Sequence, residues 1–109
     1  MFDDRLAEIN IGEFEGTDET DAEAMKLLWQ AVMSGDKGTE SYKDFMKRSC
    51  DFCDMIVEKY NGKNVLIVTH AANVRLIDYY FKGKPRDYDF MKRTVIKNGG
   101  LLTFENSKI

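Results

Sequence analysis

Hydrophobic residues of the chain fall into one short continuous run and three stretches with helical spacing. The run is VLIV at residues 65–68, which follows a turn-forming segment. A short apolar run with β-branched residues is typical of a buried parallel strand. Apolar residues then recur at helical intervals from Val74 until Gly83 and Pro85, which are common where helices end. We therefore predict a strand followed by a helix over residues 72–82.

Two more helices are predicted upstream, over residues 20–33 and 41–60, after an extended and turning segment at residues 1–16. Thr20 and Glu23 have the spacing of a capping box for the first helix. The positions predicted to face the core are Met25, Leu28, Trp29 and Val32 on the first helix, and Tyr42, Phe45, Met46, Ser49, Phe52, Cys53, Ile56 and Tyr60 on the second.

Near the carboxyl terminus, residues 94–97 and 101–104 are predicted to be extended. Asn98 and Gly99, which lie between them, have the composition of a hairpin turn.

Cys50 and Cys53 have a CxxC spacing, which is found in redox and zinc sites. Both lie in the middle of the predicted helix at 41–60, with Cys53 on its buried stripe. A redox CxxC normally opens a helix, and a zinc site needs further ligands. We interpret the two cysteines as packing residues, with no disulfide and no metal site.

Composition is compatible with one globular domain over residues 1–109, since 43% of the residues are hydrophobic. The apolar runs are too short for a transmembrane or signal segment, so a cytoplasmic protein is the default expectation. Residues 1–40 hold eleven acidic and three basic residues (−8), and residues 41–109 hold eight and thirteen (+5). Nucleic-acid binding is not expected, because neither a basic pI nor a recognised motif is present.

The single histidine, His70, follows the predicted strand and precedes the predicted helix. Free amides at a helix start and the helix dipole favour an anion there, and phosphate is the natural ligand. A histidine at this point can donate hydrogen bonds to a phosphoryl group or act as a nucleophile. The alternative is a capping or core histidine with a backbone partner.

Four segments in order, RLAEINIGEFEG (5–16), TESYKDFMKR (39–48), VLIVTH (65–70) and NGG (98–100), resemble the histidine phosphatase superfamily of phosphoglycerate mutase-like proteins. The resemblance covers nearly the whole chain. It implies an α/β fold that is part of the family's three-layer fold, with a small and mostly parallel sheet flanked by helices. It also implies transfer of a phosphoryl group from a phosphomonoester to a histidine, then to water or a substrate hydroxyl, with no metal or cofactor.

The resemblance assigns roles to three residues of this chain. His70 corresponds to the second active-site histidine, which binds the phosphoryl oxygens. Glu8 corresponds to the general acid, which needs a carboxyl group that is protonated near neutral pH and therefore a buried or anion-crowded site. The amide of Ala71 corresponds to a phosphate donor, and Arg5 is expected to position the loop. The alternative for Glu8 is a turn carboxylate paired with Arg5.

The chain departs from the family pattern in one decisive respect. The family's nucleophile is the histidine of an Arg-His-Gly motif upstream of the segment that begins at Arg5, and this sequence has no such histidine. We therefore expect the carboxyl-terminal part of a family member, which cannot carry out covalent phosphoryl transfer alone. Ala71 and Ala72 stand where the family often has glycine. Ile9 stands where mutases tend to have arginine, which argues against a mutase-like grip on the substrate.

The leading functional hypothesis is a phosphomonoester hydrolase that is inactive as this isolated chain. The alternatives are a non-catalytic remnant that binds a phosphate ester or inorganic phosphate, and an interaction module. Without the family's first strand, the apolar strand at residues 65–68 keeps an open edge, and open apolar edges recruit partners. We expect the remaining strands to re-pair into a smaller sheet or the chain to form a homodimer.

Overall fold

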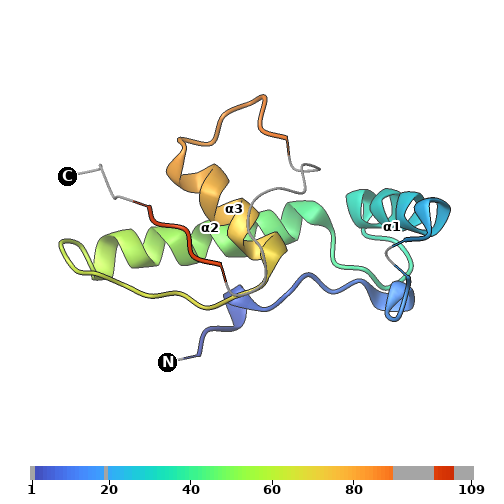
Figure 1. Cartoon of the computed structure of the whole chain (residues 1–109), viewed down its shortest axis with the longest axis horizontal. Coiled ribbons are helices and arrows are strands. Elements are labelled where there is room, and N and C mark those ends of the chain that lie inside the picture. Colours follow the sequence, from blue (N-terminus) through green and yellow to red (C-terminus); the bar gives the residue numbers. More distant parts are fainter. Residues whose placement is uncertain (1, 19, 90–99, 105–109) are drawn as a thin grey trace. The chain divides into compact units, whose positions relative to one another are not determined.

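The structure is a computed structural model that describes residues 2–18, 20–89 and 100–104 (Figure 1). Its elements, in chain order, are the 3₁₀ helices η1 (Asp4–Leu6) and η2 (Gly12–Phe14) and the α-helices α1 (Ala22–Ser34), α2 (Tyr42–Lys59) and α3 (Ala71–Phe81). No helix in the described part of the chain is long and apolar enough to cross a membrane.

The chain divides into two compact units. One consists of Ile9–Arg48 and is called the α1 unit below; the other consists of Met1–Glu8 and Ser49–Ile109 and is called the α3 unit. Helix α2 begins in the α1 unit and ends in the α3 unit.

The predicted α/β fold with a small, mostly parallel sheet is wrong, because the described residues contain no strand. Residues 65–68 lack helical structure, but their backbone N–H and C=O groups have no hydrogen-bond partner within the described part. A helix satisfies its own backbone, whereas a strand needs a neighbouring strand. Residues 101–104 form no strand either, so the expected re-pairing into a smaller sheet is not seen there. The predicted strand at 94–97 and the turn at Asn98 and Gly99 lie outside the described residues.

The three predicted helices are confirmed to within two residues at each end. The predicted capping box of α1 is wrong, because the cap is Asp21, whose Oδ1 accepts a hydrogen bond from the Ala24 amide at 3.1 Å. Thr20 is engaged elsewhere, since its hydroxyl and its amide both donate to Asp18 Oδ1. Of the positions predicted to face the core, the buried ones are Leu28, Val32, Tyr42, Phe45, Ser49, Phe52 and Cys53, and the others are half-buried.

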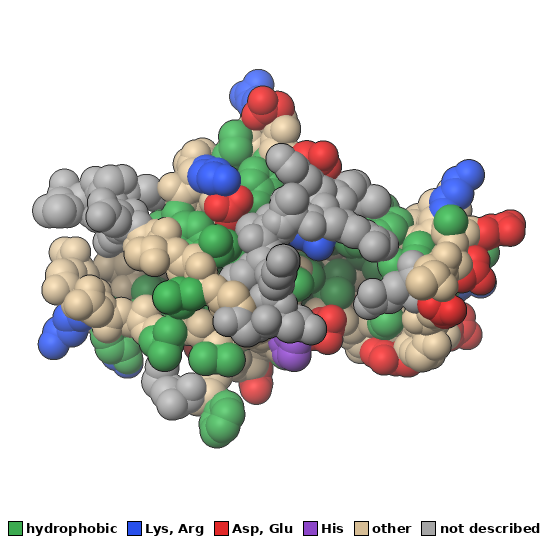
Figure 2. Space-filling view, viewed as in Figure 1, with side chains coloured by type: hydrophobic (Ala, Val, Ile, Leu, Met, Phe, Trp, Pro, Cys, Tyr) green, Lys and Arg blue, Asp and Glu red, His purple; other side chains and the backbone are tan. Residues whose placement is uncertain are grey.

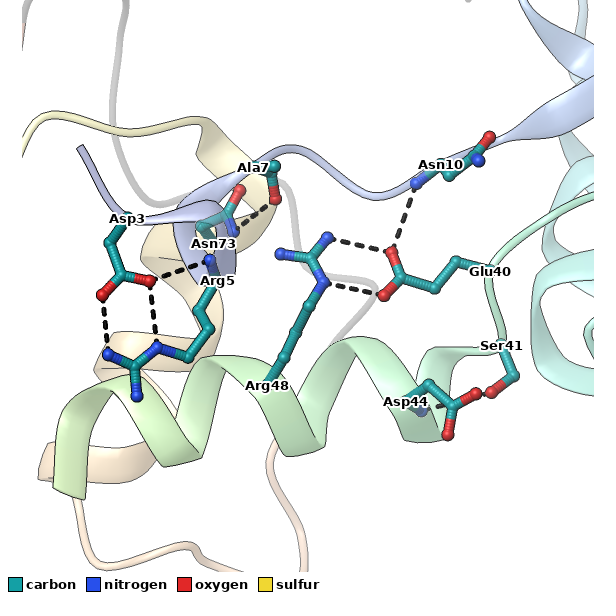
Figure 3. Close-up of polar contacts among 9 residues, drawn as sticks. All are labelled: Asp3, Arg5, Ala7, Asn10, Glu40, Ser41, Asp44, Arg48 and Asn73. Carbon is teal, nitrogen blue, oxygen red and sulfur yellow. Dashed lines mark hydrogen bonds and ion pairs between the residues drawn. The ribbon is translucent and has the colours of Figure 1, made fainter. Parts of the chain in front are cut away.

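The α1 unit is closed by a polar network and one close backbone approach. The Glu40 carboxylate accepts hydrogen bonds from Arg48 Nε at 2.7 Å, from Arg48 Nη2 at 2.9 Å and from the Asn10 amide at 3.3 Å (Figure 3). The Arg48 hydrogen bonds hold the pKa of Glu40 below its usual range. Gly12 has a φ of +49°, and a Cβ there would lie 2.4 Å from the carbonyl carbon of Gly38. Only glycine fits this position.

The core of the α3 unit forms between the second half of α2 and α3. Phe52 and Cys53 of α2 pack with Ile77 and Tyr80 of α3, and the Tyr80 hydroxyl donates to Asp54 Oδ1 at 2.6 Å. The packing interpretation of Cys53 is confirmed, because it is buried and burial raises the pKa of its thiol to about 12. Such a thiol is protonated and unreactive at neutral pH.

Candidate functional site

His70 is the N-cap residue of α3, with an extended backbone (φ −94°, ψ 160°) and no hydrogen bond from its side chain to the helix. The first amide of α3 with a helical partner is that of Val74, which donates to the His70 carbonyl at 3.0 Å. Within the described part of the chain, the amides of Ala71, Ala72 and Asn73 have no acceptor. The imidazole and three free amides therefore lie together at the positive end of the helix dipole.

Glu8, the predicted general acid, lies next to this helix start although 62 positions separate it from His70. Its Oε2 is 3.7 Å from His70 Nδ1, and the two side chains are 65% and 55% exposed. The separation exceeds a hydrogen bond, and the contact is an ion pair only when the imidazole is protonated. The structure thus brings His70, Ala71 and Glu8 together at the solvent boundary. The roles assigned to them stay predictions.

Two polar side chains that were not predicted hold the chain before Glu8 against the start of α3. Thr69 Oγ1 donates to the Leu6 carbonyl at 2.8 Å. Asn73 Nδ2 donates to the Ala7 carbonyl at 3.0 Å (Figure 3). Asn73 is fully buried. A polar residue on the apolar face of a predicted helix was the sequence signal that could have identified it.

Arg5 organises the turn that precedes Glu8. Its guanidinium donates to Asp3 through Nε at 2.9 Å and through Nη2 at 2.6 Å (Figure 3). Its Nη1 donates to the Asp51 carbonyl at 3.4 Å. The Arg5 hydrogen bonds lower the pKa of Asp3. The guanidinium also lies 5.6 Å from the centre of the Phe52 ring, on the core of the α3 unit. These contacts agree with a positioning role for Arg5.

The described residues contain no group of three or more histidine, cysteine or acidic side chains that could hold a metal ion. What the site offers instead is an imidazole, a carboxyl group and a set of backbone amides. Such groups can bind an oxyanion and transfer a proton to or from it.

A family model described as the histidine phosphatase superfamily (branch 1) matches residues 1–107. The chain therefore belongs to the histidine phosphatase superfamily, as its sequence motifs indicated. No curated protein and no solved structure matches the chain.

Proposed function

We propose that the α3 unit carries the phosphate-binding part of a histidine-phosphatase site, whose substrates are phosphomonoesters. In this proposal His70 and the amides at the start of α3 bind the phosphoryl oxygens, with the Ala71 amide as one donor. Glu8 gives a proton to the leaving oxygen. The observation that carries the proposal is the 3.7 Å approach of Glu8 to His70 at the N-terminus of α3.

The environment of Glu8 bears on its role as an acid. Its side chain is exposed, so burial does not favour the protonated carboxyl group that the role requires. A dianionic phosphoryl group bound beside it supplies a negative charge that does.

The number of histidines limits what this chain does alone. The 109 residues contain one histidine. If its imidazole binds the phosphoryl oxygens, no second imidazole remains to attack phosphorus and form the phosphohistidine. We therefore propose that the isolated chain binds phosphate without turning over phosphomonoesters.

Binding is tested by titrating inorganic phosphate into the chain while recording the imidazole signals of His70 and the amide signals of Ala71 and Ala72. We expect saturable shifts of all three in the wild type and none at the amides in His70→Ala. The substitution leaves folding intact, since His70 is exposed and makes no cap bond; its stability stays within about 0.5 kcal/mol of wild type. Absence of any saturable shift in the wild type contradicts the proposal.

Glu8→Gln is the matched variant for charge. An ionised carboxylate a few ångströms from a phosphate dianion opposes binding by about 1 kcal/mol at the protein surface. Removing the charge is therefore expected to tighten phosphate binding about fivefold at neutral pH. Equal affinities of Glu8→Gln and the wild type contradict the placement of phosphate beside Glu8.

Inactivity is tested with an aryl phosphate as substrate. We expect no turnover by the wild-type chain beyond that of His70→Ala. Turnover that disappears in His70→Ala contradicts the assignment of His70 as a binding group alone.

A further inference from the structure

The extended segment that precedes α3 presents an apolar surface to solvent. Leu66 and Val68 are 78% and 86% exposed, and Val65 is 42% exposed. Figure 2 shows hydrophobic side chains gathered on the same face of the molecule as the single histidine. Exposed apolar side chains in sequence along an extended segment are unusual for a surface loop.

The backbone of this segment is also available. Within the described part of the chain, the N–H and C=O groups of residues 65–68 take part in no hydrogen bond. A row of free donors and acceptors on an extended chain is a template for pairing with another extended chain.

Exposure along the segment alternates as in a strand with one buried face. Ile67 packs on the core of the α3 unit, and Thr69 is tied to the Leu6 carbonyl. Leu66, Val68 and His70 are exposed. Side chains of a strand alternate between its faces. The inner face is therefore already covered, the outer face is exposed, and no described residue pairs with the backbone edge.

We propose that this segment pairs with the same segment of a second copy of the chain, in antiparallel orientation about Ile67. This register sets Leu66 of each copy opposite Val68 of the other, so each exposed apolar residue meets an apolar residue on the same face. If one copy is shifted by one residue relative to the other, the outward-facing side chains of one copy lie opposite the inward-facing side chains of the other. Centring on Val68 instead sets Leu66 opposite His70.

Charge favours a second copy as the occupant. Residues 64–69 contain no charged side chain, so two identical copies do not repel each other there. The nearest flanking charge, Lys63, faces Ala71 of the other copy in this register. It then lies close to the helix start where Glu8 is held, which is an attraction between opposite charges.

The pairing is expected to be weak. A segment of about five residues buries less than the roughly 1,200 Å² of a stable complex. The dimer is therefore a concentration-dependent species rather than an obligate one. The pairing does not depend on phosphate binding at His70, so failure of one proposal leaves the other in place.

Sedimentation equilibrium of the full chain tests the proposal over a concentration range from about 10 μM to about 1 mM, where weak interfaces of this size associate. We expect the average mass to rise from one chain toward two for the wild type and to stay at one for Leu66→Lys and Val68→Lys. The matched controls are Leu27→Lys and Met33→Lys, which place the same charge on exposed apolar positions of α1 and are expected to associate as the wild type does. A wild type that stays monomeric throughout, or a Val68→Lys variant that dimerises normally, overturns the proposal.

Cross-linking tests the register. In a Cys50→Ser background, which leaves only the buried Cys53, a mixture of Leu66→Cys and Val68→Cys is expected to give several times more disulfide-linked dimer than either variant alone. The reason is that residues 66 and 68 are directly opposite in this register, whereas two copies of residue 66 are only diagonal neighbours. Equal yields in the mixture and in the single-variant samples overturn it.

Discussion

Two neighbouring stretches of the chain are both rich in apolar residues but differ in how far these residues are buried. In the VLIV run at residues 65–68, all residues except Ile67 are exposed, whereas α3 (Ala71–Phe81) buries Leu76, Ile77 and Tyr80. Figure 1 shows the extended segment leading directly into α3. Apolar composition is therefore not what separates a core element from an open one here.

The difference lies in how each stretch satisfies its backbone. The amides of α3 from Val74 onward find acceptors within the helix, so the helix needs only one apolar surface, which α2 provides. An extended segment needs a neighbouring chain for its backbone as well as an apolar surface. Residues 65–68 obtain the surface on one side only, through Ile67.

The largest expected effect compares the same substitution in the two stretches. Leu76→Ala, at a fully buried position of α3, is expected to lower the free energy of unfolding by about 2–5 kcal/mol. Leu66→Ala is the matched control and is expected to change it by less than about 0.5 kcal/mol in a dilute, monomeric sample. Urea denaturation measures both. Similar losses for the two variants would mean that the extended segment is part of the core.

The next effect is a loss of stability at alkaline pH, which arises in the core between α2 and α3. Burial raises the pKa of Cys53 from 9.0 to about 12, and burial together with the Asp54 hydrogen bond raises that of Tyr80. Because the folded-state values are raised, the unfolded chain loses these protons first. Their contribution to stability is complete below about pH 9 and is lost as the pH rises.

For Cys53 alone the expected loss is about 1 kcal/mol at pH 10 relative to pH 8. Denaturant unfolding at pH 8, 9 and 10 measures it, and Cys53→Ala is expected to show a pH dependence that is smaller by this amount. The prediction is contradicted if the unfolding free energies of the wild type and of Cys53→Ala depend on pH to the same extent.

The smallest effect tests the one polar tie described for the extended segment. Thr69→Val removes the hydroxyl that donates to the Leu6 carbonyl at 2.8 Å and keeps the shape of the side chain. We expect a loss of about 0.5–1.5 kcal/mol in unfolding free energy, because the Leu6 carbonyl loses its side-chain hydrogen-bond donor. Thr69→Ser keeps the hydrogen bond and serves as the control. An unfolding free energy of Thr69→Val equal to that of the wild type would contradict a stabilising role for this hydrogen bond.

The candidate site could be predicted in part from the sequence. The order of the motifs led to the superfamily and to His70, Glu8 and Ala71, because helix starts and family motifs are local patterns. Thr69 and Asn73 were missed, since their partners, the Leu6 and Ala7 carbonyls, are more than 60 positions away. Every residue has a backbone carbonyl, so the sequence does not reveal which of them accepts a side-chain hydrogen bond.

The sequence alone determined the three helices, because helical spacing and stop residues such as Gly83 and Pro85 act within one turn of the chain. It also determined that Cys53 belongs to a packed helix face. Only the tertiary structure decided whether residues 65–68 form a strand and whether Glu8 lies near His70. The physical reason is that a strand and a two-residue site both depend on partners distant in the chain, whereas a helix forms its backbone hydrogen bonds within itself.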